Sequence, residues 1–590
     1  MTRKAAAVRW VIQSVENRVL FIVLAGLLIP TLWVGMMADD YYLAIRVLEP
    51  TLLPPINDAS LFNMFSVSDG QSATNHYLVQ QGLMPWWTST EFHFQMWRPL
   101  AELSHWLDYS LWPHTPLLMH LHQLIWVLLF FTLAYRFLLR FSDERAVGQL
   151  AFAVFAISAN HGQTIAWLAS RNTLMATAFG MAAVLLHVRS RQRGQALSSV
   201  VGFRLLALLA FVAALLSSEY GLSASAWLFA WTFTLDRGGI QRRIVRLMPY
   251  GVIMLLWAAV YQYWNHGVTA SEYYTDPARS PWQYGLALLE AVPVILFNSV
   301  THMPAGMFGS AKFGQLGWYV ALTTSLLFLY LIRVSLRQPG QRFFLLGSLL
   351  CMIPIAAGPG GPRILAFVSL GITPLLASIV IKWAFQSETP AKQRIVSGIL
   401  AWPVLLLTVL SVATLPTVSV VYRDHDRSNV AQPARQLPIT EQDVNSSVVL
   451  INPNSMFYAI FYPLSRAYQG LPNPRNFYPL ASGDRSMTLQ RDAEHSFVLT
   501  PEDGFLLEPA AYFMRSKSEL FSVGQRFEYE GLEVEILSLL QDGRPATARF
   551  AFTKSLASDD IHLLRCEDHR FLPLQLPSVG ATINLAPCGG

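Results

Sequence analysis

The sequence predicts a mainly helical, polytopic membrane protein that carries a small strand-rich domain outside the membrane. Hydrophobic residues make up 53% of the 590 residues and charged residues only 13%, which is more apolar than a soluble core of this size requires. Apolar runs long enough to cross the roughly 30 Å core of a bilayer recur up to about residue 416. After about residue 423 the texture changes, because charged residues become frequent and short alternating runs replace the long apolar ones.

We expect about eleven membrane-spanning helices, several of them shorter than the ideal length of roughly 20 residues. The expected ranges are 19–37, 117–135, 146–159, 173–188, 203–217, 221–235, 248–263, 317–332, 343–357, 364–381 and 397–416. Another apolar segment, about 285–300, is predicted to be re-entrant or interfacial, because a crossing there would place the next arginine cluster outside. The first apolar run offers no small-residue cleavage site, so we expect an uncleaved anchor.

Clusters of lysine and arginine set the predicted orientation, because short cationic loops stay on the cytoplasmic side. Such clusters precede the first span and follow the second, fourth and sixth, for example at Arg136, Arg140 and Arg145. The N-terminus is then cytoplasmic and the tail beyond 416 lies outside, with a bacterial inner membrane as the expected location. The net charge of +5 needs no nucleic-acid partner to explain it.

Two exterior parts are expected. A large first loop, 38–115, is rich in Trp, His, Asp and Pro, and a helix that begins at Arg98-Pro99 is predicted to lie on the outer membrane surface. The chain should divide into a membrane domain, 1–422, and an exterior α+β or β-rich domain, 423–590. Cys566 and Cys588 both lie in the latter, where an oxidising compartment permits a disulfide, although the sequence leaves their pairing open.

Two adjacent carboxylates, Asp39 and Asp40, stand directly after the first apolar run. Neighbouring ionised carboxylates raise each other's pKa, which moves one toward the range of a general base unless a metal or an arginine offsets the effect. The alternative is that both cap the end of a helix and face water.

Three arginines that are distant in sequence, Arg98, Arg171 and Arg363, are predicted on the exterior side, against the positive-inside bias. Guanidinium groups bind phosphate oxygens in pairs, so a phosphate would explain them. The alternative is that each contacts lipid headgroups or pairs with a nearby acid. His161 and Glu219 fall at the outer ends of spans, and Glu272 lies in an exterior loop; packing, ion pairing and a solvated loop are the simpler explanations. The histidines match no zinc signature.

Several separate motifs occur in an order that resembles the GT-C superfamily of polytopic glycosyltransferases, especially its protein O-mannosyltransferase-like and transmembrane-TPR O-mannosyltransferase branches. The motifs are Ala38–Tyr42, Trp97–Leu100, Leu107–Tyr109, His161, Ala166-Trp167, Ser170–Asn172, Ser218–Gly221, Pro362–Leu365 and Ser369–Gly371. The resemblance covers about 20–385. The chain departs from the pattern at Asp40, Gln163 and Ser218, and no helical repeats follow, so the subfamily is left open.

The resemblance implies an inverting transfer of a hexosyl or pentosyl group from a polyprenyl-phosphate donor, such as an undecaprenyl-phosphate sugar, to a protein, lipid A or envelope glycan outside. Asp39 would be the general base, and Asp40 would orient the acceptor or hold a divalent cation, Mg²⁺ or Mn²⁺. Arg98, Arg171 and Arg363 would bind the donor phosphate. Asp108, His161, Glu219 and Glu272 would line the substrate cavity. The competing hypotheses are a polytopic lipid or glycan transporter or flippase, and a non-catalytic envelope scaffold on the same fold.

Overall fold

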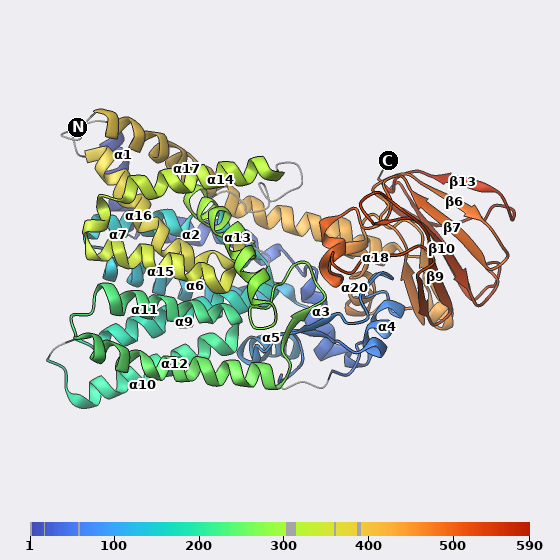
Figure 1. Cartoon of the computed structure of the whole chain (residues 1–590), viewed down its shortest axis with the longest axis horizontal. Helices are drawn as coiled ribbons and strands as arrows, with labels where there is room; N and C mark the ends of the chain where they lie inside the picture. The colour runs from blue at the N-terminus through green and yellow to red at the C-terminus, as the bar shows by residue number, and fades with distance from the viewer. Residues whose placement is uncertain are drawn as a thin grey trace.

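The long axis of the molecule runs from a helical bundle to a strand-rich domain (Figure 1). The computed structural model describes residues 3–16, 18–56, 60–192, 194–302, 314–358, 361–385 and 391–589. Most of the bundle helices run along this long axis, and α17 reaches from the bundle to the strand-rich domain.

Among the described residues, six helices are long and apolar enough to cross a membrane, and a bent N-terminal pair adds a seventh if it counts as one span. The bundle consists of α1 (Arg3–Glu16), α2 (Val19–Leu28) with η1 (Ile29–Trp33), α6 (Pro116–Phe141), α7 (Arg145–Ala156), α9 (Arg171–Arg189), α10 (Leu197–Ser217), α11 (Ser223–Thr234), α12 (Ile240–Tyr263), α13 (Pro281–Thr301), α14 (Gly314–Ile332), α15 (Pro339–Ile355), α16 (Ala366–Phe385) and α17 (Ala391–Asp426). Each predicted span overlaps a helix, and α7 and α15 are shorter apolar helices. The expected number of about eleven spans stays a prediction.

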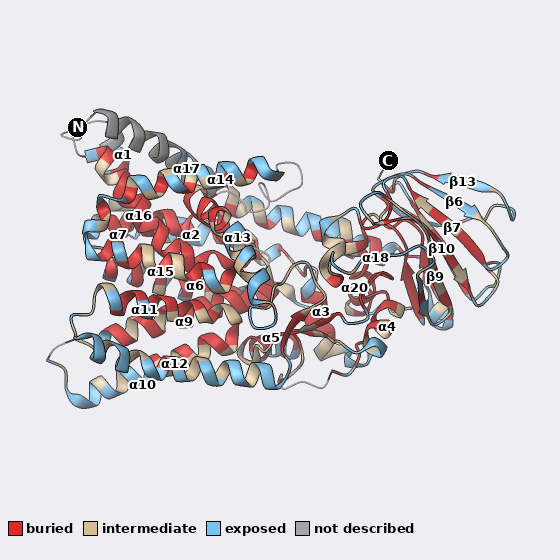
Figure 2. Ribbon diagram, viewed as in Figure 1, coloured by how far each residue is buried: buried red, intermediate tan, exposed pale blue. Residues whose placement is uncertain are grey.

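Burial within the bundle separates central helices from lipid-facing ones. α16 is buried along almost its whole length, whereas only a small part of α10 and α12 is buried (Figure 2). Leu255 is 72% exposed, a position that hydrocarbon would cover, because an apolar side chain and lipid tails are equally apolar. The protein is therefore a multi-pass membrane protein.

The segment predicted to be re-entrant or interfacial forms α13, which is itself long and apolar enough to cross a membrane. Figure 1 shows α13 inclined to the neighbouring α14 and α15. Pro281 stands in its first turn, and Pro293 lies inside the helix, where it removes a backbone hydrogen bond. Its path relative to the bilayer stays a prediction.

The first loop folds into short elements that pack beside the bundle. These are α3 (Asp39–Leu48), η2 (Pro50–Leu52), β1 (Ser66–Asp69), α4 (Ser72–Gln80), β2 (His93–Gln95) and α5 (Pro99–Leu111). β2 pairs antiparallel with β1 and with β3 (Gly267–Thr269), which follows α12. α5 begins at Pro99 as predicted, and its Leu103, Trp106, Leu107 and Leu111 are exposed, as on a helix that lies at a membrane surface.

The strand-rich domain contains a six-stranded sheet in the order β13-β6-β7-β10-β9-β8 and a four-stranded sheet in the order β12-β11-β4-β5. The strands are β4 (Ser447–Leu450), β5 (Asn476–Pro479), β6 (Met487–Arg491), β7 (Ser496–Pro501), β8 (Arg526–Tyr529), β9 (Leu532–Leu539), β10 (Pro545–Phe552), β11 (Ile561–Glu567), β12 (Arg570–Pro573) and β13 (Thr582–Leu585). β4 runs parallel to both of its neighbours, and the other pairs are antiparallel. The predicted division at 422/423 falls in the last turns of α17 and stays a proposal.

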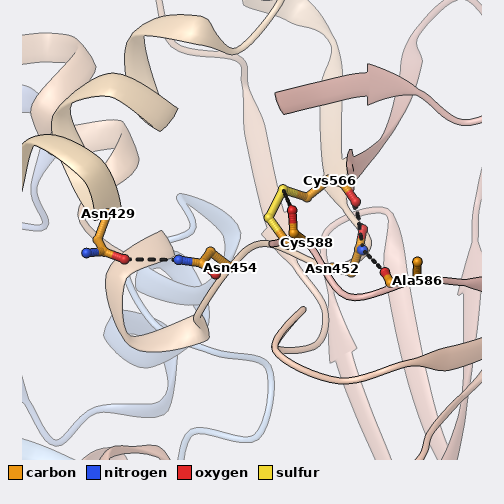
Figure 3. The surroundings of a disulfide bond; sticks show 6 residues. All are labelled: Asn429, Asn452, Asn454, Cys566, Ala586 and Cys588. Carbon is orange, nitrogen blue, oxygen red and sulfur yellow. Dashed lines mark hydrogen bonds between the residues drawn. A yellow bond between two sulfur atoms is a disulfide. The ribbon is translucent and has the colours of Figure 1, made fainter. Parts of the chain in front are cut away.

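Two features fasten this domain. Cys566 and Cys588 form a buried disulfide with Cα atoms 4.9 Å apart, which resolves the open pairing (Figure 3). Trp86 of the first loop inserts into the domain, where its Nε1 donates to Leu480 O at 2.9 Å and its ring meets Phe505, Phe527 and Phe550. The first loop and the strand-rich domain therefore share one hydrophobic core.

Candidate active site

The turn that carries Asp39 and Asp40 has an unusual backbone. Gly35 and Ala38 both have positive φ, +86° and +40°, and α3 begins at the very next residue, Asp39. A left-handed conformation suits glycine but costs a residue with a Cβ on the order of 1–3 kcal/mol. The strained Ala38 therefore needs surrounding bonds to hold it, and the structure supplies them on both sides.

Asp40 supplies one of these bonds and is fully buried. Its Oδ2 accepts from Met37 N at 3.0 Å and its Oδ1 from Ala169 N at 2.7 Å. Burial raises the pKa of this carboxyl group well above its ordinary value, although the two backbone N–H groups oppose the shift. With both oxygens engaged, Asp40 ties the first helix exit to the turn after Trp167.

Asp40 was predicted to hold a divalent cation, but the described residues around it do not supply a set of ligands for one. Both of its oxygens already accept backbone hydrogen bonds, and within the described ranges no three His, Cys, Asp or Glu side chains gather as ligands. We therefore derive no chemistry through a divalent cation.

Asp39, by contrast, is exposed to solvent. Burial by the surrounding protein still raises the pKa of its carboxyl group, while Arg363 and then Arg98 lower it. We call the surroundings of this side chain, which water reaches although protein lies close around it, the recess. The two cations that act on it come from distant parts of the chain, as predicted for Arg98 and Arg363.

Arg363 lies in η8 (Pro362–Ile364), directly before α16. Its guanidinium stands over the ring of Trp167 at 5.1 Å from the centroid, and Trp167 Nε1 donates to Met37 O at 3.3 Å. Within the described part of the chain, the Arg363 guanidinium has no hydrogen bond or ion pair to a protein group. It is therefore free to bind an anion beside Asp39.

Arg98 reaches the same recess but is already paired. Its Nε and Nη2 contact Glu219 Oε2 at 2.8 and 2.7 Å, and the Phe65 ring lies 5.0 Å from its Cζ. Tyr261 O–H donates to the other Glu219 oxygen at 3.4 Å. The pair is mostly shielded from water, so Arg98 offers positive charge to the site while Glu219 fixes its direction.

Arg171 and Asp108 form a different, closed network. Arg171 is fully buried, and its Nη1 lies 2.6 Å from Asp108 Oδ2. Its Nε donates to Gln123 Oε1 at 2.8 Å and its Nη2 to Met119 O at 3.2 Å, and Asp108 Oδ1 contacts His122 Nδ1 at 2.7 Å. The predicted phosphate role of Arg171 and cavity role of Asp108 stay predictions, and this geometry favours a structural role for both.

Two further predicted residues lie among other neighbours. His161 is buried against the rings of Phe130, Phe131 and Phe155. This environment favours the simpler explanation given above, that His161 is a packing residue. Glu272 accepts from Lys517 N at 3.1 Å and so contacts the strand-rich domain. The structure thus brings Asp39, Arg98, Glu219 and Arg363 together and engages the remaining candidates elsewhere.

Sequence reasoning missed Asp426 and two tyrosines. Asp426 ends α17, accepts from Ala38 N at 3.2 Å, and is 7% exposed. The charge of Arg363 acts on Tyr220 and Tyr274, whose pKa values burial raises, so both phenols lie near Arg363. An acid at the outer end of the last predicted span was a usable signal for Asp426, because Asp39 and Asp40 stand at the corresponding end of the first.

Fold and site together define a multi-pass membrane protein with a water-accessible carboxylate and, as far as the described residues show, a guanidinium without an ion pair, at the end of the bundle next to the strand-rich domain. No protein-family model matches the chain, and no curated protein matches it significantly in sequence.

Solved structures show weak similarity. Crystal structures of ArnT from Cupriavidus metallidurans, one bound to undecaprenyl phosphate and one in the apo state, align with TM-scores of 0.38 and 0.40 at 11% and 10% identity. They cover 79% and 81% of this chain and 90% and 86% of ArnT. The apo oligosaccharyltransferase of Archaeoglobus fulgidus aligns with a TM-score of 0.35 at 11% identity, over 75% of this chain and 64% of its own. Similarities of this size carry no argument about substrate.

Proposed function

We propose that the protein is a membrane glycosyltransferase that moves a sugar from a polyprenyl-phosphate donor to an acceptor outside a bacterial inner membrane. The observation that carries the proposal is the proximity of Asp39, a solvent-exposed carboxylate, to Arg363, a guanidinium that has no hydrogen bond or ion pair to any other described residue and rests on the Trp167 ring. The ordered motifs that resemble GT-C enzymes point in the same direction.

Each side chain has a defined task in this reaction. The acceptor hydroxyl or amine attacks the anomeric carbon of the donor, and its proton passes to the Asp39 carboxylate. The bond between that carbon and the phosphate oxygen breaks, and the electron pair leaves with the polyprenyl phosphate. Attack from the opposite face inverts the configuration at the anomeric carbon.

Arg363 stabilises the negative charge that develops on the leaving phosphate, because a cation that is already in place needs no reorganisation during the reaction. Arg98 adds a second positive charge, and its pairing with Glu219 holds it in place. The face of the Trp167 ring makes a cation–π contact with Arg363 and helps to hold it. The donor's lipid tail would remain among the apolar helices while its phosphate reaches the recess.

The direction of the reaction follows from the predicted topology. With the N-terminus cytoplasmic, the recess opens on the exterior side, where the strand-rich domain also lies. A protein, lipid A or another envelope glycan is the acceptor class consistent with that side. α5 and the first loop would border the entrance.

Comparison of Asp39→Asn with its parent in cells tests the proposal. If the enzyme transfers sugar, the polyprenyl-phosphate sugar should accumulate in Asp39→Asn membranes, and mass spectrometry should find the acceptor without its sugar. Asp424→Asn is a matched control, because Asp424 is an exposed acid on α17 outside the recess.

Two results would contradict the proposal. A scaffold would leave the donor pool and acceptor unchanged in Asp39→Asn. A transporter or flippase would change the membrane leaflet in which the donor resides, without cleavage of its glycosidic bond by the purified protein.

A further inference from the structure

Asp426 couples the last membrane helix to the turn that precedes Asp39. α17 contains 36 residues and is roughly 54 Å long at 1.5 Å per residue, so its C-terminal end extends past a bilayer core of about 30 Å. At that end, Asp426 Oδ1 accepts from Ala38 N at 3.2 Å and Oδ2 accepts from Tyr41 O–H at 2.9 Å. Residues on both sides of Asp39 are therefore held by one carboxylate, 387 positions further along by residue number.

Ala38, whose N–H Asp426 binds, is also the residue with the strained backbone. Ala38 has φ +40° and ψ −109°, a conformation that an alanine leaves when nothing holds it. Its N–H points at Asp426, and the preceding N–H, of Met37, points at Asp40. Loss of the Asp426 contact would let Ala38 relax and would turn the next side chain, Asp39, away from Arg363.

Asp426 is in turn tied to the strand-rich domain. Asn429, one turn further on, donates to His425 O at 2.8 Å and accepts from Asn454 Nδ2 at 2.9 Å. Two residues before Asn454, Asn452 bonds the backbone of Cys566 in both directions, at 3.0 and 2.8 Å, beside the disulfide (Figure 3). Two hydrogen-bonded contacts, Asn452 with Cys566 and Asn454 with Asn429, thus connect the disulfide-bonded end of the domain to the helix turn that contains Asp426.

We propose that Asp426 is a positioning residue for Asp39, which holds the strained Ala38 peptide so that the Asp39 carboxylate faces Arg363, and that the strand-rich domain anchors Asp426 through the Asn429–Asn454 contact. This inference rests on the proposed function only where it treats Asp39 as the general base. The geometric claim itself can be tested without any sugar transfer.

The experiment replaces Asp39 by cysteine in the full-length protein and measures the alkylation of the new thiol by iodoacetamide as a function of pH. Cys351 is buried and Cys566 is bonded to Cys588, so the unsubstituted protein provides the background. A thiolate reacts and a thiol does not, and nearby arginines lower a thiol pKa. The pH midpoint of alkylation therefore reports how near position 39 lies to Arg363 and Arg98.

The second change is Asp426→Ala in the Asp39→Cys background. We expect the alkylation midpoint to rise and the rate at pH 7 to fall about fivefold or more, because a thiol that turns away from the cations regains its ordinary pKa. Asp426→Asn keeps an acceptor for the Ala38 N–H and should change the rate less. Asp424→Ala, an exposed neighbour, should leave both readouts at the parent values.

Ala38→Gly gives the sharpest internal check. Glycine adopts the left-handed conformation without strain, so Ala38→Gly combined with Asp426→Ala should recover part of the lost alkylation rate. Tyr41→Phe keeps the ring and removes one bond to Asp426, so it should shift the midpoint in the same direction by less, and it serves where Asp426→Ala fails to fold. Asn454→Ala should act likewise from the domain side.

The outcomes separate this inference from the proposed function. An unchanged midpoint in folded Asp426→Ala and Tyr41→Phe proteins overturns the positioning role, whatever the activity of the parent. A shifted midpoint in a protein that transfers no sugar sustains the positioning and overturns the proposed enzyme. In the active parent with Asp39 intact, Asp426→Ala should lower kcat about 10²-fold, as small misplacements of a reacting group do, with little change in KM for the donor.

Discussion

Replacement of Arg171 by methionine should destabilise the fold, whereas the same replacement of Arg363 should spare the fold and remove function. Arg171 is fully buried, and its ion pair with Asp108 is 2.6 Å long, with Asp108 only 1% exposed. Removing one partner leaves a buried carboxylate without its cation, which costs about 3–5 kcal/mol. Among the described residues Arg363 has no ion pair to lose, only its contact with the Trp167 ring, so Arg363→Met should change the free energy of unfolding by no more than about 1 kcal/mol.

The assay is denaturant unfolding of the detergent-solubilised protein, followed by tryptophan fluorescence, together with binding of a polyprenyl phosphate. Arg171→Met should shift the unfolding midpoint strongly, and Asp108→Asn in the same chain should recover part of the loss, because it removes the orphaned charge. If Arg171→Met unfolds like the parent and loses phosphate binding, Arg171 is a phosphate ligand and its structural role is wrong.

The remaining predictions concern pH, the shared core and the disulfide. Burial raises the pKa of Asp426 to about 7, so between about pH 4 and 7 the folded state holds a proton that the unfolded state releases. Over that range the free energy of unfolding of the parent should fall by about 4 kcal/mol relative to that of Asp426→Asn. Parallel plots of unfolding free energy against pH for the two proteins would contradict this. Trp86→Ala should cost about 3–5 kcal/mol, measured by unfolding, because it empties a buried site between the first loop and the strand-rich domain; Trp86→Phe should cost less. Serine at both Cys566 and Cys588 opens a loop with a sequence separation of 22 and should destabilise the strand-rich domain by about 3 kcal/mol; an unchanged midpoint on reduction or substitution would refute that value.

The membrane architecture was predictable because its signal is local. Apolar runs give the helix positions, and Arg98-Pro99 marks the start of the helix that is α5. The short alternating runs after residue 423 predicted strands, and β9 is one of them. α13 shows the limit, since the arginine pattern argued against a crossing by a segment that length and composition allow to cross.

The site was predictable only as a list of candidates. Charge and position singled out Asp39, Arg98, Arg171 and Arg363 equally, but tertiary packing decides which arginine is free. Arg171 meets Asp108 because α5 and α9 pack together, and no sequence pattern reports that pairing. Asp40 likewise loses its freedom to a backbone N–H of Ala169, 129 residues away.

Turnover by the purified Asp39→Asn protein decides whether Asp39 is the general base of a sugar transfer. The parent and the variant, reconstituted in lipid nanodiscs, would be given an undecaprenyl-phosphate sugar and an acceptor from the envelope, and release of undecaprenyl phosphate would be followed by ³¹P NMR. If Asp39 is the general base, release should fall about 10²–10⁴-fold while the donor still binds and the protein unfolds at the parent midpoint. Release at the parental rate by a folded Asp39→Asn protein would contradict the account.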